Sequence, residues 1–439
     1  MIHQSTFETE IKSYKHKQNA AVKLIKIVSD LWFNHTIELI FFRNQLVDRR
    51  VSKILHLHEE SKALSETPIS IFGTLQVAEK IQNLKLAPSR IDIGKLALKI
   101  HEQDIDDDQL LYFIKKELIS AKEHKSFEPR YVVLYGFGRI GRLLARELIT
   151  KVGAGHQLRL RAIVTRDQIE KKTLLKRAML LQNDSIHGEF EGTVDIDEEK
   201  GALIINGATV YIISAKNPEE IDYTKYNIHN ALIIDNTGVL RDDQELSRHL
   251  ASAGASQVLL TAPGKSIPNI VYGVNTDMID TENHKIFSAA SCTTNAISPI
   301  VDVIHHTIGI SQGHIETIHS YTNDQNLVDN MHKKSRRGRA AALNMVITET
   351  GAGSAVSKVL PELAGKLTSH AIRVPVANGS LAILNLQLKK KTTGEEINNL
   401  IREASLDGRL IEQIKYSTNE ELVSTDIVGT TAAAVFDAP

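Results

Sequence analysis

Cysteine occurs once in this chain, as Cys292, and its neighbours are small and polar: the run reads Ala290-Ser291-Cys292-Thr293-Thr294-Asn295. We predict a loop that leads into a helix, because the first backbone amides of a helix stabilise a thiolate and a nearby oxyanion. A lone cysteine without such a context is more often a passive, buried residue. In this setting we interpret Cys292 as a nucleophile. One cysteine also excludes an internal disulfide and a thiolate-only metal site, and no metal is expected.

A nucleophilic cysteine needs a base, and His319 is the candidate. It lies in the segment His314-Ile315-Glu316-Thr317-Ile318-His319-Ser320-Tyr321, whose alternation of side chains predicts a strand. An imidazole within hydrogen-bond reach of the sulfur lowers the pKa of the thiol and can then accept a proton from the adduct. Any one of the 18 histidines is more often a surface or core residue. Sequence distance does not establish the contact.

A glycine-rich motif follows a predicted buried strand at residues 131–135. It reads Gly136-Phe137-Gly138-Arg139-Ile140-Gly141 and opens a predicted helix. Such a motif is a weak signal alone, but between a strand and a helix it indicates a Rossmann dinucleotide-binding domain. Gly136 makes the turn, Gly138 admits the pyrophosphate and Gly141 lets the helix pack closely on the strand.

The length of 439 residues predicts two or three domains. We expect an all-helical region at 1–128, a Rossmann domain at 129–290 and an α+β catalytic domain at 291–439. In the first region, apolar residues recur at helical spacing within 21–32 and again within 37–55. Further helices are predicted from Thr74, from a capping box at Ser89-Arg90-Ile91-Asp92, and over 110–119.

In the rest of the chain, strand-like runs alternate with polar or helical stretches, which is typical of an α/β protein. After the glycine motif, the predicted strands are 158–164, 209–213, 231–235 and 258–261. The strand at 314–321 is expected to pair with 372–376 and 381–388 in a mainly antiparallel sheet.

The run around Cys292 and the longer string Gly136-Phe137-Gly138-Arg139-Ile140-Gly141-Arg142 resemble the motifs of phosphorylating glyceraldehyde-3-phosphate dehydrogenases. The resemblance runs from about Tyr131 to Pro439. It implies that Cys292 attacks the aldehyde of a phosphorylated sugar, that His319 is the base, and that a thioester is cleaved by inorganic phosphate. It also implies NAD or NADP as cofactor, a homotetramer, and a role in glycolysis or gluconeogenesis.

The resemblance assigns further residues by position. Ser291, Thr293, Thr350 and Gly351 match those around the attacking phosphate. Thr322, Asp324 and Arg373 match those around the phosphate of the substrate. For the cofactor it implies contacts from Arg139, Ile140, Thr237, Gly238 and Thr261.

The cofactor prediction departs from the family at one point. The second strand of an NAD-binding unit usually ends in an acidic residue that holds the ribose hydroxyls, whereas this chain has Thr165-Arg166-Asp167. If Thr165 occupies that position, no carboxylate repels a 2′-phosphate and Arg166 could meet it. Asp167 could substitute only if the turn differs. We therefore expect NADP to be accepted, with NAD close behind. Lys216 stands where NAD-specific members often carry Arg.

Bulk properties exclude several other roles. A formal net charge of -1 and a pI near 7 give no general attraction to nucleic acid or membrane. The basic run at 333–339 is more typical of a solvated or ion-paired face. The N-terminus does not resemble a signal peptide and no stretch reaches the length of a membrane span, so we expect a cytoplasmic protein.

Alternatives remain open at this stage. One is oxidation of erythrose 4-phosphate, with water as the acyl acceptor. Another is an inactive cofactor-binding protein whose helical region engages a partner. The sequence ends at a stretch that resembles the family just before its last strand and helix, so we expect a chain that lacks them.

Overall fold

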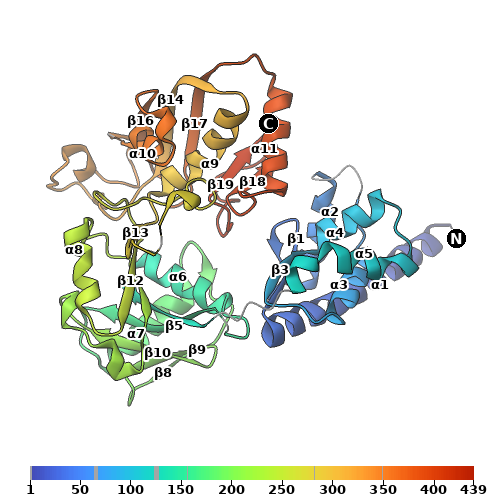
Figure 1. Ribbon diagram of the computed structural model, residues 1–439, viewed down its shortest axis with the longest axis horizontal. Helices are drawn as coiled ribbons and strands as arrows, with labels where there is room; N and C mark the ends of the chain where they lie inside the picture. Colours follow the sequence, from blue (N-terminus) through green and yellow to red (C-terminus); the bar gives the residue numbers. More distant parts are fainter. Residues whose placement is uncertain (1, 64–67, 123–127, 156, 281, 349) are drawn as a thin grey trace. The chain divides into compact units, whose positions relative to one another are not determined.

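The computed structural model of the chain describes residues 2–63, 68–122, 128–155, 157–280, 282–348 and 350–439 (Figure 1). The chain divides into two compact units. The first unit contains residues 1–130 and 148–159, and the second contains 131–147 and 160–439. The boundary predicted at residue 128 borders residues 123–127, which lie outside the described part. No helix among the described residues is both long and apolar enough to cross a membrane.

The first unit combines helices with a small sheet. Its helices are α1 (Ile2–His35), α2 (Val51–Glu60), α3 (Ile71–Gln82), α4 (Ile93–Glu102) and α5 (Asp107–Glu117). The helices predicted within 21–32, from Thr74 and over 110–119 are confirmed by α1, α3 and α5. The sheet has the order β2-β1-β3, with β1 (Ile37–Phe41) antiparallel to β2 (Asn44–Gln45) and parallel to β3 (Ser89–Asp92).

The all-helical prediction for 1–128 is therefore wrong at this sheet. Every residue of β1 is buried, whereas a helix at the surface of a small unit buries only one face. The capping box predicted at Ser89 is also wrong, because residues 89–92 form β3. The cap of α4 is Asp92, whose carboxylate accepts hydrogen bonds from the amides of Gly94 (3.0 Å) and Lys95 (3.1 Å).

The second unit begins with a doubly wound sheet. Its central order is β13-β12-β11-β4-β5-β10, and two antiparallel strands, β9 and β8, extend the β10 edge. Taken in chain order, the six central strands have the arrangement of a Rossmann dinucleotide-binding domain. The predicted strands are confirmed, with ends shifted by a few residues. The bounds are β4 (Arg130–Tyr135), β5 (Leu158–Thr165), β8 (Val194–Asp197), β9 (Ala202–Ile205), β10 (Ala208–Ser214), β11 (Ala231–Asp235), β12 (Ala255–Leu260) and β13 (Ile286–Ser288).

The glycine motif occupies the turn from β4 into α6 (Arg139–Thr150). Gly136 has a φ of 99°, in the region that favours glycine. A Cβ atom at Gly141 would lie 2.3 Å from the Gly136 carbonyl oxygen, so no other residue allows this approach of helix to strand. The same part of the chain contains the helices α7 (Lys171–Gln182) and α8 (Asp243–Ser247). It also contains a separate two-stranded sheet of β6 (Asn183–Asp184) and β7 (Gly188–Glu189).

A second sheet in this unit has the order β15-β16-β14-β17. Two of its pairs, β14 with β17 and β15 with β16, are antiparallel, and β14 with β16 is parallel. The mainly antiparallel prediction is confirmed. The bounds are β14 (Ile310–Ser320), β15 (Val346–Thr348), β16 (Leu367–Val374) and β17 (Leu381–Leu388), with helices α9 (Cys292–Thr307), α10 (Ala352–Val359) and α11 (Gly394–Leu406) and a parallel pair, β18 (Ile414–Ser417) and β19 (Ala434–Asp437).

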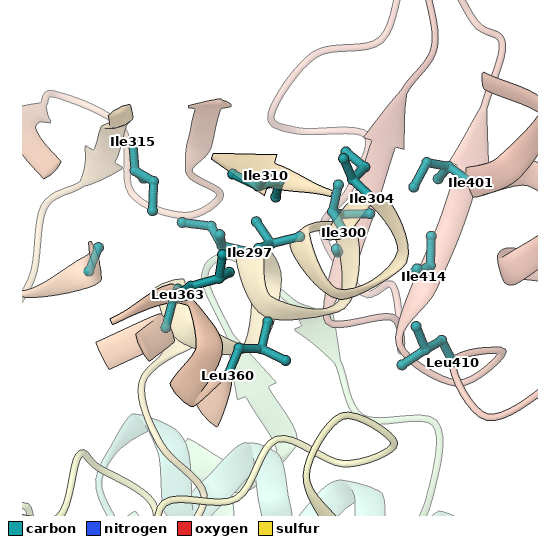
Figure 2. Packing of buried hydrophobic residues seen from close by; sticks show 14 residues of the cluster. Ile297, Ile300, Ile304, Ile310, Ile315, Leu360, Leu363, Ile401, Leu410 and Ile414 are labelled. Atoms are coloured by element: carbon teal, nitrogen blue, oxygen red, sulfur yellow. The ribbon is translucent and has the colours of Figure 1, made fainter. Parts of the chain in front are cut away.

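The apolar core of this part forms around α9, the helix that begins at Cys292. Figure 2 shows Ile297, Ile300 and Ile304 of α9 among buried side chains from the sheet, from α11 and from the segment around Leu360 and Leu363. Burial of these side chains stabilises the helix by removing apolar area from water. The position of Cys292 is therefore fixed by packing on the far side of its own helix.

We predict that Leu363→Ala lowers the free energy of unfolding by about 2–5 kcal/mol, because Leu363 is fully buried and its loss leaves a cavity. Urea denaturation measures this. Leu175→Ala is the matched control: its side chain is 44% exposed, and the expected change is within about 0.5 kcal/mol. Equal effects of the two substitutions would contradict the assigned core.

Candidate active site

Cys292 is the first residue of α9, and the turn before it is held by side chains. Ser291 is the N-cap, and its Oγ accepts a hydrogen bond from the Thr294 amide (3.0 Å). Asn295 donates from Nδ2 to the carbonyl oxygens of Ala289 (2.7 Å) and Ser291 (3.0 Å). The predicted loop leading into a helix is confirmed. The sulfur thus lies where helix amides and the helix dipole favour negative charge.

The structure brings Cys292 and His319 together. The Cys292 Sγ lies 3.7 Å from His319 Nε2, and the cysteine side chain is exposed to solvent. The contact between Sγ and His319 Nε2 is the largest influence on the pKa of the thiol and lowers it, whereas partial desolvation of the sulfur acts the other way. Thr293, whose Oγ1 is 3.9 Å from Sγ, also lowers the pKa. A thiol with a lowered pKa and access to solvent is a competent nucleophile.

The other ring nitrogen of His319 has two neighbours. Nδ1 lies 2.7 Å from the Ser320 carbonyl oxygen and 2.8 Å from Nη1 of Arg373, which also donates to that carbonyl at 2.8 Å. Arginine can only donate, so Nδ1 either donates a hydrogen bond to the Ser320 carbonyl oxygen or accepts one from Nη1 of Arg373. In the first case Nε2 is free to accept a proton from the sulfur or from a substrate hydroxyl.

Strand register explains this grouping. In the parallel pair of β14 and β16, His319 is directly opposite Arg373. Opposed residues on one face of a sheet lie close enough for their side chains to touch. The sequence predicted that these two segments pair, but in a mainly antiparallel sheet. The parallel register that puts His319 opposite Arg373 was not foreseen.

A cluster of charged groups lies beside Arg373. Arg337 forms an ion pair with Asp324 and donates from Nη2 to Thr348 Oγ1 (3.0 Å), and Thr322 also donates to Asp324. Burial alone would raise the pKa of Asp324, but the hydrogen bonds from Thr322 and Arg337 lower it. Asp324 is therefore a carboxylate whose charge Arg337 balances.

Both arginines of this cluster have hydrogen-bonding capacity left over. The Nε atoms of Arg373 and Arg337 are buried and have no partner among the described residues. Burial, and then the proximity of Arg337, lower the pKa of Arg373, yet a guanidinium stays charged. Buried, unpaired N–H groups on adjacent guanidinium groups suit a phosphate. Arg337 lay in the basic run at 333–339 and was not singled out from the sequence.

Thr350 and Gly351 lie at a second helix start. Gly351 is the N-cap of α10, and Thr350 Oγ1 accepts a hydrogen bond from the Ala352 amide at 3.2 Å. Among the contacts of the described residues, none joins either of them to Cys292. Their part in the same site stays a prediction.

The glycine motif opens on a pocket of about 350 Å³. Of the residues predicted for the cofactor, Gly136, Gly138, Thr165, Arg166 and Thr237 line it. The others are outside its lining, in α6 or just after strands of the same sheet: Arg139, Ile140 and Gly141 in α6, Lys216 after β10, Gly238 after β11 and Thr261 after β12. The pocket lies at the carboxyl ends of the strands, where such sheets bind dinucleotides.

A buried pair of side chains, Asp235 and His249, holds Thr237 of the pocket lining in place. Asp235 accepts hydrogen bonds at Oδ1 from the amide and the hydroxyl of Thr237, both at 2.7 Å, and its Oδ2 is 3.1 Å from Nε2 of His249. Asp235 and His249 are fully buried, and the ring of Tyr135 meets that of His249 edge-on. Sequence reasoning missed this pair, because an acid at the end of a strand gives no sign of which histidine it meets.

Arg177 of α7 was also missed. It lines the pocket and donates to the carboxylate of Asp167 from Nε (2.9 Å) and from Nη2. Among the described residues, no group of three or more histidine, cysteine, aspartate or glutamate side chains could hold a metal ion.

The strand order, the glycine turn and the thiol–imidazole pair define the class of this protein: an oxidoreductase with a dinucleotide-binding domain. Family models give the particular group. The NAD-binding domain of glyceraldehyde 3-phosphate dehydrogenase matches residues 130–243, and the C-terminal domain of that enzyme matches residues 291–439. The chain belongs to the glyceraldehyde 3-phosphate dehydrogenase family.

Relatives agree with this assignment. A glyceraldehyde-3-phosphate dehydrogenase-like protein of Pseudomonas aeruginosa is 47% identical over 425 residues, which cover 94% of this chain and 91% of the relative. Glyceraldehyde-3-phosphate dehydrogenase 2 of Trichormus variabilis is 41% identical over 70% of this chain and 88% of its own. Glyceraldehyde-3-phosphate dehydrogenase 1 of Bacillus subtilis is 38% identical, covering 70% and 87%. The first alignment is long enough to include most of the N-terminal region.

We predict that alkylation of Cys292 by iodoacetamide follows a thiolate titration with a midpoint below that of an ordinary cysteine thiol, because the contact with His319 lowers the pKa. His319→Asn removes that contact, so the midpoint should move to higher pH. His314→Asn is the matched control, since His314 lies on the same strand and contacts Thr368. The interpretation is wrong if the His319 variant and the wild type titrate together.

Proposed function

We propose that this protein is a phosphorylating aldehyde dehydrogenase that oxidises glyceraldehyde 3-phosphate with NAD or NADP and inorganic phosphate to an acyl phosphate. The observation that carries the proposal is the 3.7 Å approach of Cys292 Sγ to His319 Nε2, beside the guanidinium group of Arg373. A nucleophile, a base and an anion site in contact are what this reaction requires.

The reaction begins when His319 Nε2 takes the proton of the Cys292 thiol and the thiolate attacks the aldehyde carbon. A C–S bond forms, the C=O π electrons move to oxygen, and His319 returns the proton to that oxygen to give a hemithioacetal. His319 Nε2 accepts the proton of the hemithioacetal hydroxyl as the carbon is oxidised to a thioester. A bound nicotinamide supplies the hydride acceptor for this step. Attack of inorganic phosphate on the thioester carbon then breaks the C–S bond, releases the acyl phosphate and restores the thiolate.

Two groups of residues would hold the two phosphates. Thr322, Asp324 and Arg373 would hold the phosphate of the substrate, and we add Arg337, whose Nε is buried and unpaired. Ser291, Thr293, Thr350 and Gly351 would hold the attacking phosphate. Support for the second group comes from the helix starts at Cys292 and Ala352, where backbone amides favour an anion.

The pocket at the glycine motif fits a dinucleotide. The turn at Gly136 leaves backbone at the strand end open to a pyrophosphate, and the buried Thr165 hydroxyl in the lining has no partner among the described residues. The family's domain is an NAD-binding one. We propose that NADP is accepted as well, because the second strand ends in Thr165 and Arg166 rather than in an acid.

We also propose a homotetramer, as the family resemblance implies, in the cytoplasm, with no nucleic-acid or membrane partner. Apolar side chains exposed on the second sheet support an oligomer, among them Ile347 (63% exposed), Leu381 (52%) and Ile383 (40%). The proposed division is 1–128 as an added unit, 129–290 for cofactor binding and 291–439 for catalysis.

The purified full chain should reduce NAD or NADP when given glyceraldehyde 3-phosphate and phosphate. Cys292→Ser should reduce this rate by on the order of 10³-fold or more, because the covalent step needs the sulfur. Absorbance of the reduced cofactor measures it, and unchanged cofactor binding by the variant is the control. Substantial turnover by Cys292→Ser would refute the covalent route.

The acyl acceptor is tested separately. Turnover should depend on added phosphate, and the product should be an acyl phosphate that hydroxylamine traps. Phosphate-independent formation of the free acid, fastest with erythrose 4-phosphate, would instead favour water as the acceptor. Cofactor binding without turnover on either sugar would indicate a binding protein.

A further inference from the structure

We propose that Arg177 forms, with Arg166 and Thr165, a binding subsite for the 2′-phosphate of NADP, and that its ion pair with Asp167 removes the carboxylate that would otherwise favour NAD. This rests on the proposed use of the pocket by a dinucleotide. It goes further by naming the groups that discriminate between the two cofactors.

The charge of the pocket lining is the first argument. Two guanidinium groups, Arg166 and Arg177, belong to the lining, and neither Asp167 nor any other carboxylate does. A Rossmann domain selective for NAD presents a carboxylate to the ribose hydroxyls, whereas an arginine nearby accommodates a 2′-phosphate. The balance of charge in this lining therefore favours the phosphorylated ribose.

The buried hydroxyl of Thr165 is the second argument. Thr165 ends β5 with 7% of its surface exposed, and its Oγ1 has no partner among the described residues. A buried polar atom without a partner is costly unless a ligand supplies one. A threonine hydroxyl can donate to a phosphate oxygen without the repulsion that a carboxylate at this point would cause.

The geometry of Arg177 is the third argument. Its Nε and Nη2 donate to Asp167 Oδ2, and its Nη1 donates to the Phe137 carbonyl oxygen at 3.3 Å. A guanidinium group carries five N–H donors, so roughly two remain, one on each terminal nitrogen. The ion pair thus fixes the guanidinium plane against the glycine turn and leaves donors for an anion.

The ion pair with Arg177 also balances the negative charge of Asp167. Asp167 lies two positions beyond the end of β5, and both hydrogen bonds from Arg177 go to its Oδ2. Removing Arg177 would leave a negative charge close to the pocket with nothing to balance it. Loss of Arg177 should therefore weaken NADP binding for two reasons: the N–H donors are lost, and the unpaired Asp167 carboxylate repels the 2′-phosphate. Binding of NAD, which has no 2′-phosphate, should be little affected.

The experiment measures dissociation constants of the full chain for NADP and NAD by isothermal titration calorimetry, with 2′,5′-ADP and 5′-AMP as probes of the adenosine end. Arg177→Leu should raise the constant for NADP and for 2′,5′-ADP by roughly 10- to 100-fold, the value of one charge-assisted hydrogen-bonding group. Binding of NAD and 5′-AMP should stay within about threefold.

Two further variants separate charge from structure. Asp167→Asn removes the negative charge and keeps Arg177, so NADP binding should be retained or tightened. Lys176→Leu is the matched control: it removes a positive charge from the same helix, but Lys176 does not line this pocket. Its effect on either cofactor should be small. Thermal unfolding of each variant checks that it is folded.

Three results would overturn the proposal. One is an Arg177→Leu variant that binds NADP as tightly as the wild type does. Another is equal weakening of both cofactors, which would assign Arg177 to support of the Phe137 turn. The third is a wild type that binds neither cofactor, and that result alone would also refute the proposed function.

Discussion

The approach of Cys292 Sγ to His319 Nε2 is the constraint on which the candidate active site depends, and two unrelated parts of the chain must be fixed to produce it. Cys292 is held by the capped start of α9, whose apolar side is buried in the core. His319 is held by the register of β14 against its neighbours. A shift of β14 by one residue would turn His319 to the other face of the sheet, because strand residues alternate between faces. A shift of α9 by one residue would rotate Cys292 away from His319.

Arg373 links the thiol–imidazole pair to the proposed phosphate site. Its Nη1 is within hydrogen-bond distance of His319 Nδ1 and of the Ser320 carbonyl, and its Nε is buried without a partner among the described residues. The Asp324 carboxylate balances one of the two guanidinium charges of this cluster by pairing with Arg337. The site therefore combines charged donors for an anion with an imidazole that contacts the thiol.

Sequence reasoning predicted the parts of this site whose signal is local. The Cys292 run identified a helix start, and the glycine motif identified the turn from β4 into α6, because backbone geometry at each point demands those residue types. The first unit shows where local signals fail. Residues 37–41 have apolar side chains at spacings compatible with a helix, yet they pair with β3, a segment far along the chain. At residues 37–41 the pairing with β3 determines the structure. The spacing of apolar residues within one segment does not reveal a pairing with a distant segment.

The residues that escaped prediction belong to contacts between separate elements. Asp235 at the end of β11 meets His249, Arg177 of α7 meets Asp167 after β5, and Arg337 meets Asp324. Such pairs leave no motif, because each half is an ordinary residue until the fold joins it to the other. They also explain how the charge at the proposed adenosine end of the pocket can change while the glycine turn stays the same. The turn is specified by sterics, because a Cβ atom at Gly141 would lie only 2.3 Å from the Gly136 carbonyl oxygen. The net charge at the end of β5 depends instead on the ion pair between Asp167 and Arg177.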